Sequence, residues 1–261
     1  MKLTGKTALV TGAGTGIGQG IAVELARRGA QVAVHYNRSA DGALETKRRI
    51  EEAGASCMLV QADVAHKPDI DRMVRETVDR FGTVDILINN AAMQLNYDLF
   101  EYDEEQFDRM MAVNLKGYWQ CIQAVVPCMK ARGQGRIVNI SSVHGKRPTD
   151  FDPVYAMTKG GIRMLGRESA IELGRYGITV NTVEPGAVDV GKRSSMRSAP
   201  PPPANVAKPK SRPRDIRRKF PLGRVGLPGD VAHLVCHIVS DESEFLNGAA
   251  IIESAFNFGN R

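Results

Sequence analysis

The chain has 261 residues and a net charge of +6, with 43% hydrophobic and 25% charged residues. This composition is typical of a soluble globular protein and excludes a fibrous or disordered state for most of the chain. No apolar run approaches the roughly 18 residues that a membrane-spanning helix needs, and no apolar signal core follows Met1. Four cysteines without metal or redox spacing favour reduced thiols and a cytoplasmic location.

The positive charge is concentrated in one segment, residues 191–219. Ten Lys and Arg residues and a single acid, Asp215, lie there, so the rest of the chain is net acidic. Nucleic acid is therefore not an expected partner, since its binding needs a basic folded surface. The segment also holds six of the thirteen prolines. We expect a mobile excursion, because so few apolar groups cannot offset the entropy of ordering it.

Short apolar runs alternate with amphipathic segments of helix length along the rest of the chain. The runs of strand length are residues 7–11, 31–36, 57–61, 86–89, 136–140, 179–183 and 249–252. The helical patterns lie near residues 16–29, 41–53, 67–82, 102–131, 153–175 and 228–240. Nearly continuous apolar strands separated by helices predict an α/β fold with a doubly wound parallel sheet and helices on both faces.

The first expected strand leads directly into a glycine-rich turn, TGAGTGIG, at residues 11–18. Glycines let the backbone turn tightly beside a pyrophosphate, and the following helix offers free N–H groups. This strand–turn–helix context favours a dinucleotide site over an ordinary glycine-rich loop. The second strand is followed not by an acid but by Arg38 and Ser39, which could hold a 2′-phosphate. We therefore expect NADP(H) rather than NAD(H).

A phenol and an ammonium group stand at i and i+4 on one expected helix, as Tyr155 and Lys159. A buried ammonium beside a phenol favours the phenolate and lowers the tyrosine pKa. Ser142 ends a strand thirteen residues before the tyrosine, at the sheet edge where ligands bind. By itself the Tyr/Lys pair fits a solvated helix face better than a catalytic site. The choice between these two interpretations therefore depends on the other motifs in the chain.

Six motifs occur in one order. They are TGAGTGIG from residue 11, Asn89-Asn90-Ala91, Asn114, Ser142, YAMTK from residue 155 and Pro185-Gly186. In this combination the chain resembles the short-chain dehydrogenase/reductase family over residues 1–190 and again from about 221 to 252. The run SSVH at residues 141–144 is similar to the glucose/sugar-dehydrogenase branch of that family. The resemblance implies one Rossmann-type domain over residues 1–261, about seven parallel strands, and a homotetramer or dimer.

The resemblance also implies hydride transfer between NAD(P) and a small carbonyl or alcohol substrate, with residues 191–219 as a substrate lid. Tyr155 would be the acid/base for the substrate oxygen, and Ser142 would polarise that oxygen. Lys159 would lower the tyrosine pKa and hold the nicotinamide ribose, and Asn114 would support a proton-relaying water. The expected cofactor contacts are Gly12, Thr15, Gly16, Ile17, Gly18, Arg38, Ser39, Asp63, Val64, Asn90, Ala91, Ile140, Tyr155, Lys159, Pro185, Gly186 and Val188. Candidate substrate contacts are Gln94 and His144, and no metal site is expected.

Two enzymatic alternatives stay open at this point. The first is an NADP(H)-dependent alcohol or sugar dehydrogenase. The second is a reductase of 3-oxoacyl groups on an acyl carrier, or of ketones in general, because a basic lid could attract an acidic carrier. A non-catalytic nucleotide sensor predicts loss of Tyr155 or Lys159, and both are present. Binding to nucleic acid or membranes through residues 192–219 would rest on charge alone, so neither partner is expected.

Overall fold

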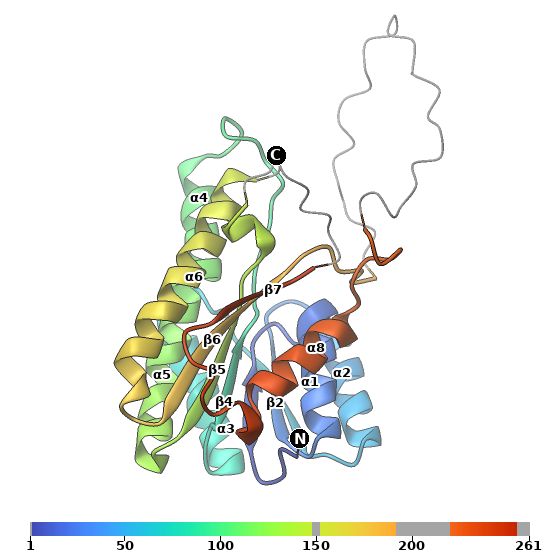
Figure 1. The fold of residues 1–261 in the computed structure, drawn as a ribbon, viewed down its shortest axis with the longest axis vertical. Helices are drawn as coiled ribbons and strands as arrows, with labels where there is room; N and C mark the ends of the chain where they lie inside the picture. The colour runs from blue at the N-terminus through green and yellow to red at the C-terminus, as the bar shows by residue number, and fades with distance from the viewer. Residues whose placement is uncertain (1, 148–151, 192–219, 255–261) are drawn as a thin grey trace, which may run out of the picture.

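The computed structural model describes residues 2–147, 152–191 and 220–254. Its strands are β1 (Thr7–Val10), β2 (Gln31–Tyr36), β3 (Cys57–Gln61), β4 (Ile86–Asn89), β5 (Gly135–Ile140), β6 (Ile178–Pro185) and β7 (Ala250–Glu253). They form one parallel sheet in the order β3-β2-β1-β4-β5-β6-β7 (Figure 1). The predicted doubly wound sheet is confirmed. Its order reverses between β1 and β4, and ligands bind beyond the carboxyl ends of strands at such a point.

Helices cover both faces of the sheet (Figure 1). They are α1 (Gly16–Arg27), α2 (Ala40–Glu52), α3 (Lys67–Phe81), α4 (Glu104–Met111), α5 (Gly117–Arg132), α6 (Pro153–Gly174) and α8 (Pro228–Ile238). Alternate strand residues face opposite layers. In β1, Ala8 and Val10 pack with α1, α2 and α8, whereas Leu9 packs with α3, α5 and α6. Both faces are therefore buried, which explains the nearly continuous apolar strands.

One predicted helix differs from the structure. Residues 102–131 are expected to form a single helix, but a π-helical turn, Ala112–Lys116, separates α4 from α5. The wider turn carries Asn114, which is fully buried. Such turns are rare and are found frequently at functional sites. The amino end of α4 is set by Asp103 and Gln106, which form a capping box.

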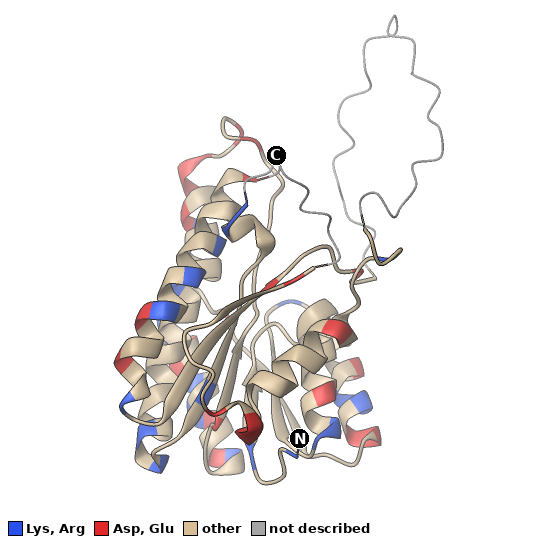
Figure 2. Cartoon of the chain, viewed as in Figure 1, with Lys and Arg blue, Asp and Glu red and all other residues tan. Residues whose placement is uncertain are grey.

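Charged side chains lie mainly on the helices and at strand ends, and the middle of the sheet carries almost none (Figure 2). Within residues 2–147, 152–191 and 220–254, no helix combines the length and apolar character needed to cross a bilayer. In the same residues no three His, Cys, Asp or Glu side chains are arranged to hold a metal ion. Of the expected mobile lid, residues 191–219, all but Gly191 lie outside the described residues.

Candidate active site

A cleft of about 630 Å³ lies where the carboxyl ends of β1 to β6 meet. Most residues expected to contact the cofactor or the substrate oxygen line it. They are Gly12, Thr15, Gly16, Ile17, Arg38, Ser39, Asp63, Val64, Asn90, Ala91, Ile140, Ser142, Tyr155, Lys159, Pro185 and Gly186. Val190 also lines the cleft, at a position where the family resemblance suggests a cofactor contact. The lining residues that sequence reasoning missed are His35, Asn37, Ala92, Met93, Arg109, Val113 and Ser141.

Two expected cofactor contacts do not line the cleft. Gly18 lies in the first turn of α1 behind Asn90, and a Cβ there would come within 2.4 Å of the Asn90 Nδ2 atom. This glycine therefore serves close packing of the turn. Val188 pairs with Gly226 in an isolated β-bridge. Val190, two residues further on, reaches the cleft instead.

The end of the cleft beside the glycine turn and the start of α1 is formed by backbone groups. Gly12 has a φ of +65°, which favours glycine, and Asn90 Nδ2 donates to the carbonyls of Thr11 and Gly12 at 2.9 and 3.1 Å. Thr15, at the amino end of α1, makes no side-chain capping bond, and no acid lies in the first helical turn. The N–H groups of that turn are therefore available to an anion, as phosphate binding at a helix terminus requires.

His35 joins this turn to the end of β3. Its Nδ1 accepts from the Gly12 N–H at 2.9 Å, so Nε2 carries the proton and donates to the Ala62 carbonyl at 3.0 Å. The ring is buried, and burial lowers its pKa from 6.5 to about 4. His35 is thus a neutral side chain whose two ring nitrogens bridge the backbone of the glycine turn and the end of β3. The available sequence signal is a histidine that directly follows the apolar residues Val32, Ala33 and Val34 of β2.

Arg38 and Ser39 follow β2 at the same end of the cleft. The Arg38 side chain is exposed, and no carboxylate of the described residues forms an ion pair with it. Ser39 lies against the glycine turn, because a Cβ on Gly14 would come within 2.3 Å of its Oγ. A guanidinium and a hydroxyl beside a dinucleotide turn suit a phosphate monoester on the ribose.

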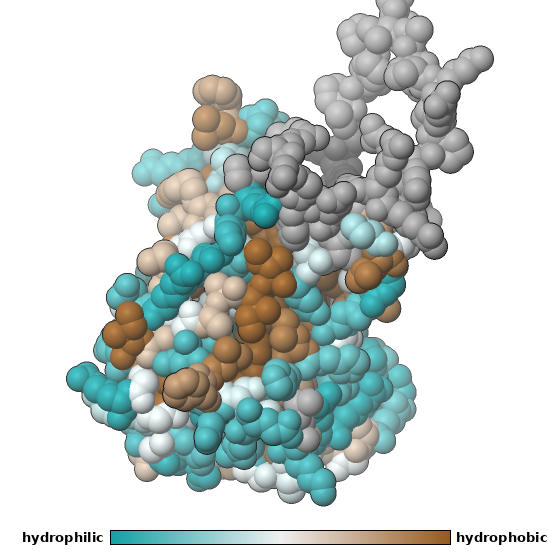
Figure 3. All heavy atoms as spheres, viewed as in Figure 1, coloured by the Kyte–Doolittle hydropathy of each residue, from teal (hydrophilic) through white to brown (hydrophobic). Residues whose placement is uncertain are grey.

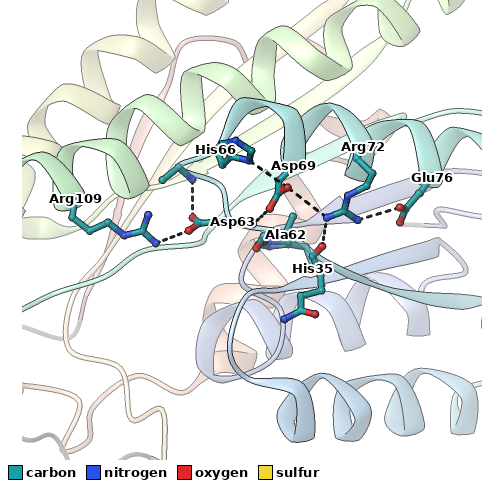
Figure 4. A network of polar contacts seen from close by, with 10 residues as sticks. His35, Ala62, Asp63, His66, Asp69, Arg72, Glu76 and Arg109 are labelled. Atoms are coloured by element: carbon teal, nitrogen blue, oxygen red, sulfur yellow. Dashed lines mark hydrogen bonds and ion pairs between the residues drawn. The ribbon is translucent and has the colours of Figure 1, made fainter.

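Asp63 links two elements that lie far apart in the sequence. Its carboxylate accepts from the Ala65 N–H at 3.0 Å and from Arg109 of α4 at 2.7 Å (Figure 4). Burial opposes ionisation of Asp63, but these hydrogen bonds outweigh it and hold the pKa below its usual value. The Asp63 N–H donates to Asp69 at 3.0 Å. This network fixes the loop after β3 where it borders the cleft.

The other end of the cleft is formed by buried side chains. Lys159, 2% exposed, donates from Nζ to the Ile140 carbonyl at 2.9 Å and lies 5.4 Å from the centre of the Tyr155 ring. Burial lowers the lysine pKa to about 7. Burial also raises the pKa of Tyr155 to about 12, although a hydrogen bond with Ser142 lowers it. In the protein alone, burial therefore raises the pKa of Tyr155 instead of Lys159 lowering it as the sequence predicts.

The remaining predicted residues, Asn114, His144 and Gln94, do not line the cleft. Asn114 Nδ2 donates to the Met93 carbonyl at 2.9 Å and to Thr158 Oγ1 at 3.3 Å, and its Oδ1 accepts from the Met93 N–H at 2.8 Å. The His144 ring lies 6.3 Å from the Tyr155 ring in an edge arrangement but does not line the cleft. Gln94 is exposed and lies outside the cleft.

The model of the short chain dehydrogenase family matches residues 6–200. The chain belongs to this family. The 3-oxoacyl-(acyl-carrier-protein) reductase of Staphylococcus aureus is 36% identical over 251 residues, which are 96% of this chain and 97% of that protein. The enzyme is therefore an NAD(P)-dependent oxidoreductase of the short-chain dehydrogenase family.

Solved structures of the family superpose over nearly the whole chain. A putative short-chain alcohol dehydrogenase from Sinorhizobium meliloti has a TM-score of 0.86 at 30% identity, and the match covers 96% of this chain and 95% of that one. A short-chain dehydrogenase from Burkholderia cenocepacia in complex with NADP has a TM-score of 0.84 at 32% identity, covering 98% and 99%.

The residues of the cleft fit a nicotinamide dinucleotide. A Cβ on Gly12 would come within 2.8 Å of Ala91 Cα, so the turn packs this closely against the loop after β4 only because residue 12 has no side chain. The uncapped amino end of α1 would hold the pyrophosphate. Pro185 and Gly186 line the cleft at the end of β6, which β1, β4 and β5 separate from β2 and Arg38 in the sheet. The cleft thus runs from the glycine turn and the start of α1 to the side chains of Tyr155 and Lys159.

Proposed function

We propose that this enzyme interconverts an alcohol or sugar hydroxyl and a carbonyl with NADP(H), and that Tyr155 is the acid/base. The observation that carries the proposal is one continuous cleft. Arg38 and Ser39 border one end, and Ser142, Tyr155 and Lys159 border the other. Hydride transfer to a carbonyl carbon builds negative charge on the oxygen, so a fixed proton donor belongs beside it.

We call the end of the cleft with Ser142, Tyr155 and Lys159 the reactive end. Each of these residues has a distinct role in the proposed reaction. When bound, the nicotinamide supplies or accepts the hydride. The Tyr155 hydroxyl gives its proton to the substrate oxygen during reduction and takes it back during oxidation. The Ser142 hydroxyl donates a hydrogen bond to the same oxygen. Lys159 replaces the tyrosine proton through its ammonium group, which a pKa of about 7 leaves able to exchange protons near neutral pH.

The preference for NADP(H) rests on Arg38 and Ser39. An acid at this place would accept a hydrogen bond from the ribose 2′-hydroxyl and repel a 2′-phosphate. Here a guanidinium without a carboxylate partner among the described residues lies at the cleft instead. The relative from B. cenocepacia binds NADP, which supports the same choice.

The test is NADPH oxidation by the purified protein against aldoses, ketoses, diketones and 3-oxo esters. We expect turnover with at least one carbonyl class, a higher kcat/KM with NADPH than with NADH, and loss of turnover in Tyr155→Phe. Most of the activity surviving in Tyr155→Phe would overturn the mechanism. A large preference of the parent enzyme for NADH would overturn the cofactor assignment.

A second candidate is the reduction of 3-oxoacyl groups on an acyl carrier. It is supported by the S. aureus relative, whose name states this activity and which matches 96% of this chain. The same panel separates the candidates. A kcat/KM for 3-oxo esters far above that for sugars favours the reductase, and the opposite ranking favours the sugar dehydrogenase.

We also infer a homo-oligomer, a tetramer or dimer, located in the cytoplasm. A groove along α4 to α6 is lined by Met111, Leu115, Trp119 and Leu165, and Trp119 is 44% exposed. The edge strand β7 carries Ala250, Ile251 and Ile252, and its residues are only half-buried beside an apolar surface patch (Figure 3). Contact with further copies of the chain would bury these apolar surfaces. A stable monomer in analytical ultracentrifugation would contradict the inferred oligomer.

The cytoplasmic location is supported by the cysteines. All four are unpaired, which fits a reducing compartment.

A further inference from the structure

The loop between β4 and α4, residues 90–103, forms one wall of the reactive end through Met93. Two buried side chains hold this wall. Asn114 bonds both backbone groups of Met93, at 2.8 and 2.9 Å. Asp152 accepts from the Asn96 N–H at 3.0 Å. Because these anchor points are three residues apart, the short stretch between them is held at both ends.

Asp152 occupies the N-cap of the catalytic helix α6. Its Oδ1 accepts from the Tyr155 backbone N–H at 3.0 Å and from the Tyr102 hydroxyl at 2.6 Å, while Oδ2 accepts from Asn96. The residue is 3% exposed. No cation of the described residues forms an ion pair with it. Three neutral donors and the positive end of a helix therefore balance this buried charge.

This carboxylate does more than cap the helix. Ser, Thr and Asn cap a helix about as well as Asp, but none of them offers two acceptor oxygens. At Asp152 both oxygens are used, and two of the three donors, Asn96 and Tyr102, come from the β4–α4 loop. The cap thus joins the loop to the helix that carries Tyr155.

The backbone of Asn96 depends on the same contact. Its φ of +59° is the only positive value among the non-glycine residues that the structure describes. A side chain in this left-handed region costs energy and persists where the surroundings hold it. The hydrogen bond from the Asn96 N–H to Asp152 stabilises this backbone conformation of Asn96. Asparagine tolerates this region better than most residues, and the hydrogen bond to Asp152 fixes the loop there.

We propose that Asp152 is a positioning residue that fixes the substrate wall of the cleft to the catalytic helix. Through this one carboxylate, the fit of the carbonyl substrate against Met93 and the orientation of Tyr155 depend on each other. The inference rests on the proposed function of Tyr155 as acid/base, but not on the identity of the substrate.

The charge of Asp152 also acts on Tyr155. After burial, which is the larger effect, Asp152 raises the pKa of Tyr155. Among the described residues, the other titratable groups around the two are Lys159 on α6, Tyr118 on α5, His144 in the turn before α6 and Tyr102 in the loop. Removal of the carboxylate charge is expected to lower the pKa of Tyr155, so the pH profile of kcat moves to lower pH.

Two variants separate position from charge. Asp152→Asn keeps the size of the side chain and one acceptor oxygen, but it cannot serve all three donors and it loses the charge. We expect KM for the best carbonyl substrate to rise about tenfold to a hundredfold, together with the shift in pH profile. Tyr102→Phe removes one loop contact and keeps the charge. We expect a rise in KM of about tenfold with the pH profile unchanged.

Asp103→Asn is the matched control, because Asp103 is an exposed cap at the other end of the same loop. It should change neither KM nor the pH profile. All three variants should keep the parent dissociation constant for NADPH. Parent values of KM and pH profile in Asp152→Asn would overturn the proposal, and so would an equal loss of NADPH affinity, which would indicate general unfolding.

Hydrogen exchange decides the inference independently of activity. Peptides covering residues 93–102 should exchange faster in Asp152→Asn than in the parent or in Asp103→Asn. Unchanged exchange there would overturn the proposal even if the enzyme turned over no substrate in the panel. By contrast, an inactive parent enzyme, or an active Tyr155→Phe, would contradict the proposed function and leave the exchange result to stand by itself.

Discussion

The two ends of the cleft differ in whether backbone groups or buried side chains form them. The dinucleotide end consists of backbone groups around Gly12 and the first turn of α1, with the exposed Arg38 beside them. The reactive end consists of side chains buried in the fold, including Lys159, Asn114 and Asp152. This contrast indicates that changes at the first end alter cofactor affinity and specificity, whereas changes at the second alter kcat or the KM of the carbonyl substrate. The following predictions test that division.

The largest expected effect lies at the reactive end. In Lys159→Met, kcat is expected to fall on the order of 10³-fold, because proton exchange with Tyr155 is lost. The free energy of unfolding near pH 7 should not fall, since removal of a buried ammonium offsets the lost bond to the Ile140 carbonyl. Steady-state kinetics and urea denaturation check both statements. Activity within tenfold of the parent would contradict the role of Lys159.

His35 provides a test through pH. The folded pKa is about 4 and the unfolded value 6.5, so the native state binds fewer protons between these values. The stabilisation from neutral His35 is complete above pH 6.5 and is lost as pH falls toward 4, amounting to about 3 kcal/mol.

In His35→Gln the free energy of unfolding should depend less on pH between 6.5 and 4 than it does in the parent. Urea denaturation of both proteins at pH 7 and pH 5 measures this difference. Identical pH dependence in the two proteins would show that His35 does not titrate as a buried neutral group.

Arg38→Asp is expected to change cofactor choice at the dinucleotide end. The loss of a charge-assisted hydrogen bond and the added repulsion should lower kcat/KM with NADPH about tenfold to a hundredfold. The kcat/KM with NADH should be maintained or raised, because an acid can accept from the ribose hydroxyl. Equal losses with both cofactors would show that Arg38 does not read the 2′ position.

The smallest expected effect lies outside both ends of the cleft. Asp103→Ala removes a capping box from α4, which should lower the free energy of unfolding by about 1 kcal/mol. The kcat and both Michaelis constants should stay at parent values. Thermal denaturation and steady-state kinetics check this. A kinetic defect would mean that the amino end of α4 belongs to the reactive end.

The fold was largely predictable from the sequence, because parallel strands buried on both faces leave clear apolar runs. The strand β2, for example, has the predicted bounds of residues 31–36. The π-helical turn around Asn114 was not predictable. Its geometry is set by contacts with Met93 and Thr158, which lie 21 and 44 residues away in the sequence, and no local propensity encodes them.

The site was predictable where function depends on local motifs. The glycine turn and the spacing of Tyr155 and Lys159 lead to residues that do line one cleft. The roles of Arg109 and Asp152 could not be read in the same way. Arg109 reaches Asp63 across 46 residues of sequence, and Asn96 reaches Asp152 across 56. Such pairs depend on how the elements pack, so only the structure shows them.

The central claim is that binding and chemistry lie at opposite ends of one cleft. It is tested most directly by measuring the NADPH dissociation constant and kcat side by side in Tyr155→Phe and Arg38→Asp. The account predicts that Tyr155→Phe binds NADPH like the parent but loses turnover, and that Arg38→Asp binds NADPH weakly but keeps kcat at saturation. The reverse pattern, or equal losses of both quantities in both variants, would contradict it.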